Sequence, residues 1–508
     1  METRSTYRSS RRDRDYAPRT WSTSPSSDPI GHPSVIETHL RRTALLIGSA
    51  LFVCCGSSNP EGPSLILVVV DTLREDFLGC YGFEGETSPN LDRLAREGIV
   101  FDNCFAQAPW TKPSVATLLT SLHPRTHGVL THHGWFDKRD GEEPVEAHAA
   151  GSDAGGEEAV TDVLPQEALT LAEVLRSRGY RTAAFVANPW IRREWGFAQG
   201  FDVFRQFQEQ TAQRPILEAT QWLEEIGDRP GFVLLHLMDV HGPYDAPEDD
   251  FRALGDSQGL SLSRPLDDRA LERIPEYLRL AAWAKEPAAR DLNTWRTRYA
   301  AGVRSVDRAI GALVQNLGAD DRLENTVLMV TSDHGEELME HDGWDHGRNL
   351  FDHQTHVPWI VRLPQMRHAG RRVNSVVSLA DVMPTALSFL GCSIPATLQG
   401  VDRSALDESD DPLAASFAEG IKWQPQVFSV RTGAYKLVAD LQQNKHALYH
   451  LPTDPGEVRD VSTREPETIR LLLEQLRFHI ETTGERGLRP TQVDISEGLQ
   501  AELNDLGY

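Results

Sequence analysis

Three apolar runs of strand length are each followed by side chains that can bind a metal ion. The residues that follow the runs 65–70, 232–238 and 326–331 are Asp71, Asp239, His241, Asp333 and His334. Because the carboxyl ends of parallel strands meet at one edge of an open sheet, these carboxylates and imidazoles are expected to lie together. Asp and His are ligands of Zn²⁺ and Mn²⁺, so the pattern predicts a metal site there. The alternative for each Asp alone is a helix cap after its strand.

A hydroxyl at the start of a predicted helix is the second chemical signal. In the segment 108–122, Pro113 suits the first turn, and the Ala, Leu and Thr residues after it can continue a helix. Thr111 is then at the amino end, where free N–H groups and the helix dipole stabilise an anion. Next to a divalent cation, its hydroxyl can ionise and attack phosphorus or sulfur. The alternative is that Thr111 only caps the helix.

The elements that must position these residues follow an α/β pattern. Apolar runs of strand length alternate with helical patterns, which is typical of a large, mostly parallel sheet flanked by helices; the runs are 65–70, 182–187, 232–238, 326–331 and 357–363. Helices are predicted over 89–97, with Ser88 as cap, over 169–178, and along 303–317. The stretch 137–159 is predicted to be a surface loop insertion, and 246–291 a helical lid.

Beyond about residue 400 the pattern changes to that of a small α+β domain. A hairpin is predicted over 427–438, a strand at 447–451 and an amphipathic helix over 466–481. The resulting division is a leader at 1–60, a catalytic domain at 61–400 and a C-terminal subdomain at 401–508, which has a short antiparallel sheet and a helix.

The charge balance and the leader bear on partners and location. Lys and Arg number 51 against 75 Asp and Glu, a net charge of −24, which argues against nucleic-acid binding. Five cysteines in 508 residues are too few for a disulfide framework. The apolar run 44–53 follows two arginines and ends at Cys54 and Cys55, as in a bacterial lipoprotein signal with one of these cysteines lipidated. We therefore expect export with a lipid anchor; the alternatives are plain periplasmic export and a cytoplasmic protein.

Eight short motifs occur in one order between residue 64 and about residue 460. They are LVVVDTLRED from 67, TSPNLDRLA from 87, TKPS from 111, HGPY from 241, SDHGEE from 332, VPWIV from 357, DVMPT from 381 and DPGE from 454. Together they resemble the sulfatase family of the alkaline phosphatase superfamily. The resemblance implies an alkaline-phosphatase-like α/β sandwich and an ester hydrolase that acts on a small-molecule, glycan or lipid ester.

The resemblance also implies roles for individual residues. Asp71, Asp333 and His334 would hold the metal together with the Thr111 oxygen. His241 would contact the substrate oxyanion or protonate the leaving group. His346, in a Trp-Asp-His-Gly motif, stands where related phosphoethanolamine transferases have a substrate-binding histidine.

Two departures from the family pattern change the expected chemistry. Thr111 occupies the place of the cysteine that sulfatases oxidise to formylglycine, and Val115 replaces the usual arginine, so formylglycine cannot form. A threonine ester must be cleared by water or an acceptor alcohol, which favours phosphoric over sulfuric esters. Thr72 replaces a second Asp and His334 replaces an Asn, which favours Zn²⁺ or Mn²⁺ over Ca²⁺.

Several further residues have two interpretations each. Lys112, Arg125 and Arg348 can contact a substrate anion or lie on a solvated surface. His123 and His127 are expected to be structural, and Cys104 to be a buried apolar residue.

Two other functions stay open at this stage. One is a transferase that moves a phospho-headgroup through a Thr111 ester, although such enzymes usually carry several amino-terminal membrane helices. The other is a degenerate binding protein, against which the retention of Asp71, Asp333, His334 and a hydroxyl at 111 argues.

Overall fold

The structure is a computed structural model, which describes residues 62–130, 132–133, 160–208, 211–255, 260, 263–406, 414–422 and 426–505. All of them belong to one compact unit. The predicted leader with Cys54 and Cys55, and the predicted insertion 137–159, lie outside the described residues.

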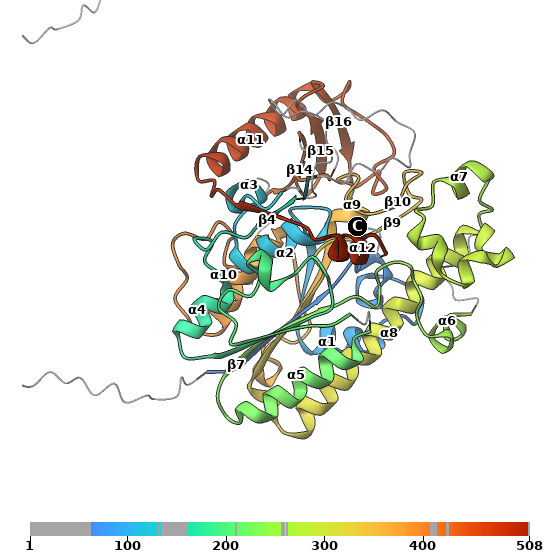
Figure 1. The fold of residues 1–508 in the computed structure, drawn as a ribbon. Helices are drawn as coiled ribbons and strands as arrows, with labels where there is room; N and C mark the ends of the chain where they lie inside the picture. Colours follow the sequence, from blue (N-terminus) through green and yellow to red (C-terminus); the bar gives the residue numbers. More distant parts are fainter. Residues whose placement is uncertain are drawn as a thin grey trace, which may run out of the picture. The chain divides into compact units, whose positions relative to one another are not determined.

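An eight-stranded, mostly parallel sheet forms the centre of the unit (Figure 1). Its order is β12 (Arg371–Ser378), β2 (Ile99–Phe105), β11 (His356–Arg362), β8 (Thr326–Thr331), β1 (Ser64–Val70), β7 (Gly231–Leu237), β5 (Arg181–Val186) and β6 (Val203–Gln206). All five predicted runs are strands, and the predicted fold class is confirmed. β11 alone runs antiparallel to both of its neighbours, because the chain after β8 stays at the same sheet edge and re-enters the sheet from there.

The sheet is buried on both faces, which explains its continuous apolar runs. Alternate residues of β1 point to opposite sides. Ile66, Val68 and Val70 pack in one hydrophobic cluster, whereas Leu65, Leu67 and Val69 pack in another.

Helices cover both faces of the sheet (Figure 1). The first cluster includes residues of α1 (Pro89–Glu97), α5 (Gln213–Ile226) and α8 (Leu292–Ala319). The second includes residues of α2 (Thr111–Thr120), α4 (Leu171–Ser177) and α10 (Val382–Phe389). The predicted helices over 89–97 and 169–178 are therefore confirmed. Ser88 precedes α1, but its hydroxyl donates to Asp92 Oδ1 instead of capping the backbone.

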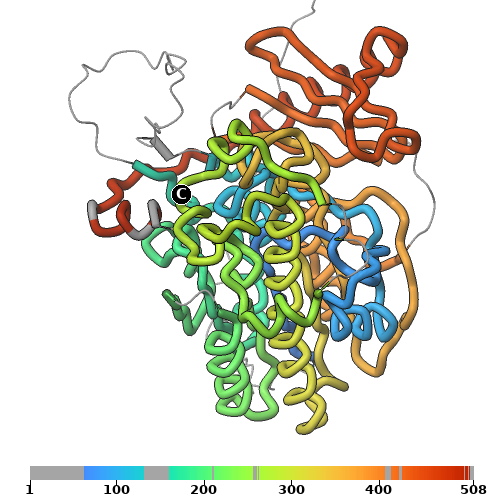
Figure 2. The backbone as a smooth tube through the Cα atoms, turned by 90° about the vertical axis from the view of Figure 1, so that its right-hand side faces the viewer, coloured from blue at the N-terminus to red at the C-terminus, as the bar shows by residue number. Residues whose placement is uncertain are grey.

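The predicted C-terminal hairpin, strand and helix are present. A four-stranded antiparallel sheet joins β13 (Ser416–Ala418), β14 (Val427–Arg431), β15 (Tyr435–Asp440) and β16 (Lys445–His450). The helix α11 (Pro466–Glu485) packs on it through Ile469, Leu472 and Leu476. After α11 the chain leaves the four-stranded sheet (Figure 2). β17 (Thr491–Asp494) pairs with β4 (Val160–Val163), and α12 (Glu497–Asp505) follows. β17 therefore belongs to a different sheet from β13, β14, β15 and β16.

The segment predicted as a lid consists of short helices. They are α6 (Glu248–Leu254), α7 (Asp268–Glu272) and the 3₁₀ turns Tyr277–Leu280, Trp283–Lys285 and Pro287–Arg290. None of the helices in the described ranges is long and apolar enough to cross a membrane.

Candidate active site

Four predicted residues meet at the carboxyl edge of the central sheet. His334 Nε2 lies 3.3 Å from Thr111 Oγ1, 3.6 Å from Asp71 Oδ1 and 3.6 Å from Asp333 Oδ2. All four side chains are fully buried. We call these four residues the nucleophile cluster.

The sheet register explains why two strands deliver their carboxylates to one place. β1 and β8 are parallel neighbours in which Val69 pairs with Thr331, so the residues just beyond both strands emerge side by side. Thr111 comes from a different element, because α2 begins at this residue. The Ser114 hydroxyl on the first turn of α2 donates to the Asp333 carbonyl at 2.5 Å, which ties the helix to the loop after β8.

The nucleophile cluster fits a divalent cation. His334 Nδ1 lies 2.9 Å from the Gly335 carbonyl; donation there leaves the Nε2 lone pair facing the cluster, an orientation common in metal-binding histidines. Asp71 Oδ1 and Asp333 Oδ2 receive no hydrogen bond from any described residue. Buried lone pairs that converge without a donor are costly unless a cation balances them.

The electrostatics of the two carboxylates agree with that interpretation. Burial, together with the neighbouring Asp333, raises the pKa of Asp71 to about 7. Burial also raises the pKa of Asp333 and lowers the pKa of His334 to about 3. The site therefore disfavours its own negative charge until a positive ion is added.

Asn188 belongs to the site but was not among the predicted residues. Its Nδ2 lies 2.5 Å from Asp71 Oδ2 and 3.4 Å from Thr111 Oγ1. The Trp190 N–H donates to Asn188 Oδ1 at 2.7 Å, which turns the amide N–H groups toward the cluster. Asn188 can thus stabilise negative charge on the Thr111 oxygen. Its sequence signal was its place directly after the run 182–187.

His236 is a second residue that the sequence did not reveal. It lies inside β7 and is fully buried, with Nε2 3.5 Å from Asp333 Oδ2. Burial lowers the pKa of His236 to about 4. A single histidine inside an apolar strand gives no signal that separates it from a core residue.

His241 and His346 lie beside the nucleophile cluster. The ring centroids of His334 and His346 are 4.5 Å apart, and those of His241 and His346 are 5.2 Å apart. His241 Nδ1 lies 2.9 Å from the Gly242 carbonyl. Burial lowers the pKa of His346 to about 4 and also lowers the pKa of His241. Both imidazoles are therefore neutral near pH 7 before a substrate binds.

Two buried carboxylates orient His346. Its Nδ1 lies 3.2 Å from Glu336 Oε1 and 3.0 Å from Asp345 Oδ1. Asp345 has a left-handed φ of 76°, a conformation that is strained for a residue with a side chain. Glu336, Asp345 and His346 form the second buried group of metal-ligand type in the described residues. An Nδ1–H between two carboxylates, however, explains this arrangement without an ion.

The remaining predicted residues lie in other surroundings. Lys112 is fully buried, with its ammonium on Thr161 Oγ1 and 4.3 Å from the Trp195 ring centroid. The prediction that Lys112 lies on a solvated surface is therefore wrong. Arg125 pairs with Glu419 at 2.8 Å, and Arg348 is exposed.

Asp239 does not join the nucleophile cluster, although it follows a strand of the same sheet. The Ser305 hydroxyl of α8 donates to its carboxylate at 3.2 Å. The expectation that Asp239 lies together with the other side chains is wrong, because the turn after β7 directs this side chain to α8 and presents His241 instead.

His123, His127 and Cys104 have no part in the cluster. His127 is buried and bonds Thr117 Oγ1 at 3.1 Å and the Val129 N–H at 3.0 Å. The ring of His123 packs edge-on against His479. Cys104 is a buried free thiol, as expected.

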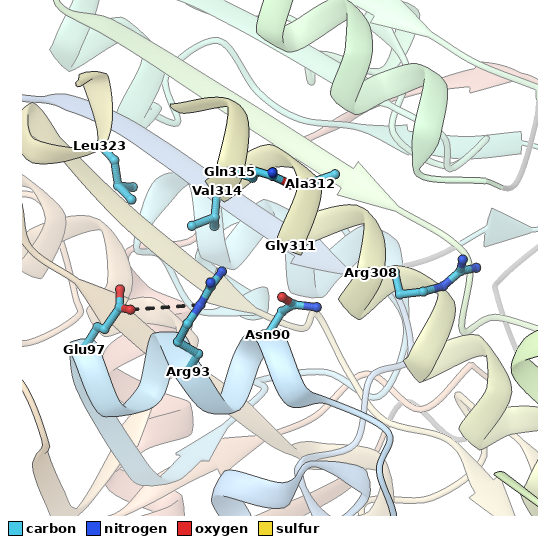
Figure 3. A pocket seen from close by; sticks show the side chains of 9 residues that line it. All are labelled: Asn90, Arg93, Glu97, Arg308, Gly311, Ala312, Val314, Gln315 and Leu323. Carbon is cyan, nitrogen blue, oxygen red and sulfur yellow. Dashed lines mark ion pairs between the residues drawn. The ribbon is translucent and has the colours of Figure 1, made fainter. Parts of the chain in front are cut away.

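A surface pocket of about 620 Å³ lies between α1 and α8, away from this chemistry (Figure 3). Its lining includes Asn90, Arg308 and the ion pair between Arg93 and Glu97. None of the residues of the nucleophile cluster lines it.

Comparison with known proteins agrees with this fold. The family model described as Sulfatase matches residues 63–392, and the model for the C-terminal part of N-sulphoglucosamine sulphohydrolase matches residues 339–483. The fold and the first of these matches define an ester hydrolase of the alkaline phosphatase type. The chain belongs to the sulfatase family.

Relatives within the family are distant. An ulvan-active sulfatase of Formosa agariphila is 23% identical over 421 residues, which are 74% of this chain and 72% of that protein. The solved phosphonate monoester hydrolase of Agrobacterium radiobacter is 21% identical with a TM-score of 0.62, over 84% of this chain and 96% of that one. A structure solved in complex with its substrate D-glucosamine-2-N,6-O-disulfate is 20% identical with a TM-score of 0.62, over 84% of this chain and 99% of that one.

Proposed function

We propose that this sulfatase-family hydrolase is metal-dependent and uses the Thr111 hydroxyl as its nucleophile. The observation that carries the proposal is the placement of Thr111 Oγ1 at the start of α2, 3.3 Å from His334 Nε2 and within the nucleophile cluster. A helix cap alone would not need two buried carboxylates that each have one oxygen without a donor among the described residues.

Asp71, Asp333, His334 and the Thr111 oxygen would hold the ion. A bound divalent cation would lower the pKa of the hydroxyl and neutralise one oxygen of the ester. An imidazole in the set favours Zn²⁺ or Mn²⁺ over Ca²⁺. Thr72 has no carboxylate to add, and its hydroxyl donates to the Asp71 carbonyl at 2.7 Å.

The chain's own groups then carry the reaction. Thr111 Oγ1 gives up its proton and attacks the central phosphorus or sulfur, so that the bond to Oγ1 forms while the bond to the leaving oxygen breaks and the leaving oxygen takes up one proton. The Asn188 amide and the amino end of α2 stabilise negative charge on Oγ1 and on the ester. A water molecule next attacks the threonine ester, the bond to Oγ1 breaks, and the proton of the water returns to Thr111.

His241 or His346 donates a proton to the leaving oxygen. Both are neutral beforehand because burial lowers their pKa values. A bound anion stabilises the protonated form of a nearby imidazole, so either one can take up a proton in the complex and donate it to the leaving oxygen. Glu336 and Asp345 hold His346 Nδ1 in place for this step.

Phosphoric or phosphonic esters are the favoured substrates. Formylglycine cannot form at Thr111, so the threonine ester must be opened by attack at its central atom. The fold shared with a phosphonate monoester hydrolase is consistent with this choice. The fold shared with a protein that binds a disulfated glucosamine keeps sulfuric esters of glycans as the second class.

A panel of esters tests the proposal. The metal-loaded protein is incubated with an aryl sulfate, an aryl phosphate, an aryl phosphodiester and a phosphonate ester, beside Thr111→Ala and Thr111→Ser. We expect phosphoester turnover that Thr111→Ala abolishes and Thr111→Ser retains in part. Turnover of the sulfate alone would reverse the substrate order, and transfer to an added alcohol in preference to water would favour the transferase. No turnover of any ester would favour the binding protein.

Export with a lipid anchor on Cys54 or Cys55 is proposed from the sequence alone. Mass spectrometry of the mature amino terminus is expected to find a diacylglyceryl-cysteine. An intact Met1 would contradict it.

A further inference from the structure

A lysine from a segment remote in sequence reaches the candidate active site. Lys422 lies in the segment 414–422, which contains β13. Its backbone N–H donates to the Gly347 carbonyl at 3.0 Å, one residue after His346. The segment is therefore docked on the loop that carries His346.

Gly347 makes room for the Lys422 side chain. A Cβ at Gly347 would lie 3.1 Å from Lys422 Cδ, 3.2 Å from Cγ and 3.3 Å from Cε, and the φ of Gly347 is +78°. Any side chain at position 347 would thus press on the aliphatic part of Lys422 and strain the backbone. The aliphatic part of the Lys422 side chain thus packs against Gly347, where no side chain is in its way.

The same segment is also joined to the loop that leads to Thr111. The Trp110 indole N–H donates to the Gly420 carbonyl at 2.8 Å, and the Glu419 N–H donates to the Gln107 carbonyl at 2.9 Å. Lys422 Nζ lies 5.6 Å from the Trp110 ring centroid. The ammonium is therefore held between the residue before the nucleophile and the loop of His346.

The charges around Lys422 are those of the site itself. Burial lowers the pKa of Lys422 to about 8, and Arg348 acts in the same direction, whereas Asp345, Glu336 and Asp71 oppose it. At neutral pH the ammonium stays mostly charged. Asp345, Glu336 and Asp71 stabilise the charged form of the partly buried ammonium, which can therefore contact an anion that enters the site.

We infer that Lys422 is a substrate-binding residue whose ammonium contacts a nonbridging oxygen of the ester positioned at Thr111. The inference rests on the proposed function and deepens it, because a second positive group beside the metal ligands selects for a dianionic ester. Phosphate monoesters approach two negative charges at neutral pH, whereas phosphonate monoesters, phosphodiesters and sulfate monoesters carry one. Lys422 would thus favour the phosphate monoester over the other classes.

Kinetics and anion binding of three lysine variants test the inference. Lys422→Met is compared with Lys422→Arg, which keeps the charge, and with Lys445→Met, whose lysine is exposed on β16 of the C-terminal sheet. For an aryl phosphate monoester we expect the KM of Lys422→Met to rise about 10- to 100-fold, the range for a lost charged hydrogen bond. We expect a smaller rise for an aryl phosphodiester, partial rescue by Lys422→Arg, and no change in Lys445→Met.

Calorimetric titration with inorganic phosphate separates this inference from the proposed function. Wild-type turnover with an unchanged KM and phosphate affinity in Lys422→Met would overturn the inference and leave the function intact. So would a lower melting temperature of Lys422→Met without any change in KM. If the wild type hydrolyses no ester but binds phosphate through Lys422, the inference stands and the proposed hydrolase fails; absence of both would overturn both.

Discussion

At the scale of single residues, the candidate site depends on donors that hold charge on one oxygen. Asn188 is fixed by the Trp190 N–H and directs its amide N–H groups to Asp71 and Thr111. Comparable donors to a developing anion contribute on the order of 3 kcal/mol to catalysis. A neutral amide suits this role, because a charged residue there would compete with the cation for Asp71.

Replacement of that amide should slow the chemical step. We expect Asn188→Ala to lower kcat about 100-fold, since one donor to the Thr111 oxygen is lost, with a small change in KM. Steady-state kinetics on the best ester of the panel measures it. Asn103→Ala is the matched control, because the Asn103 amide donates to the Asn374 carbonyl between β2 and β12. Equal rates in Asn188→Ala and the wild type would remove Asn188 from the mechanism.

The pH dependence of folding stability can show whether Lys112 binds substrate or is a buried structural residue. Burial lowers the pKa of Lys112 from 10.5 to about 7. Between pH 7 and 9 the unfolded chain therefore binds more protons at this lysine than the folded chain does, so folding stability rises with pH. Relative to Lys112→Met, the wild type should gain about 2 kcal/mol over this interval.

Urea denaturation of both proteins at pH 7 and pH 9 measures that gain. A constant difference between them at the two pH values would contradict the neutral, buried lysine. If Lys112→Met instead raises KM with no change in the pH dependence of stability, Lys112 binds the substrate anion, as the sequence alternative holds.

At the scale of elements, helix α2 and the loop after β8 must stay in register for the site to form. The Ser114 hydroxyl joins them through the Asp333 carbonyl at 2.5 Å, and both groups are buried. The Trp110 indole joins the start of α2 to the segment 414–422. Thr111 is thus positioned by contacts between elements that are distant in the sequence.

Removal of the Ser114 hydroxyl should loosen this junction. Ser114→Ala leaves the buried Asp333 carbonyl without this donor, which costs about 1 to 3 kcal/mol of unfolding free energy. We expect a lower melting temperature and weaker metal binding together, measured by calorimetry on one sample. Thr220→Ala serves as control, because its hydroxyl donates to a carbonyl within α5. Normal metal affinity in a destabilised Ser114→Ala would show that the junction does not position Asp333.

At the scale of the whole molecule, the site residues fall into those that the sequence could place and those that it could not. Asp71, Asp333 and His334 follow apolar runs that are neighbouring parallel strands. The rule that ligands bind at the carboxyl ends of the strands of an open sheet therefore placed them. The same rule failed for Asp239, because the direction of a side chain after a strand depends on the local turn. The mostly parallel sheet was predictable, whereas the antiparallel β11 depended on the path of the loop 332–355.

Residues contributed by packing gave no comparable signal. His236 lies within an apolar strand, and its contact with Asp333 exists only because β7 and β8 flank β1. Lys422 follows Thr111 by more than three hundred positions, and its approach depends on the docking of the segment 414–422. Such contacts follow from tertiary structure, which spacing along the chain does not encode.

Metal binding should stabilise the whole folded unit, because the ligands come from β1, α2 and the loop after β8. A ligand at one hundred times its Kd adds about 2.7 kcal/mol, so removal of the metal with a chelator should lower the melting temperature by several degrees. Differential scanning calorimetry should show that Zn²⁺ or Mn²⁺ restores it more fully than Ca²⁺. In Asp333→Asn the melting temperature should respond little to any of these ions; an equal response in that variant would place the metal elsewhere.

The most direct measurement is the identification of the covalent intermediate. The metal-loaded protein is mixed with an aryl phosphate, quenched in acid within the first turnover, digested and sequenced by mass spectrometry. We expect a phosphoryl group on the Thr111 oxygen that disappears when substrate is exhausted and is absent in Thr111→Ala. A phosphoryl group on another residue, or undiminished hydrolysis by Thr111→Ala, would contradict it.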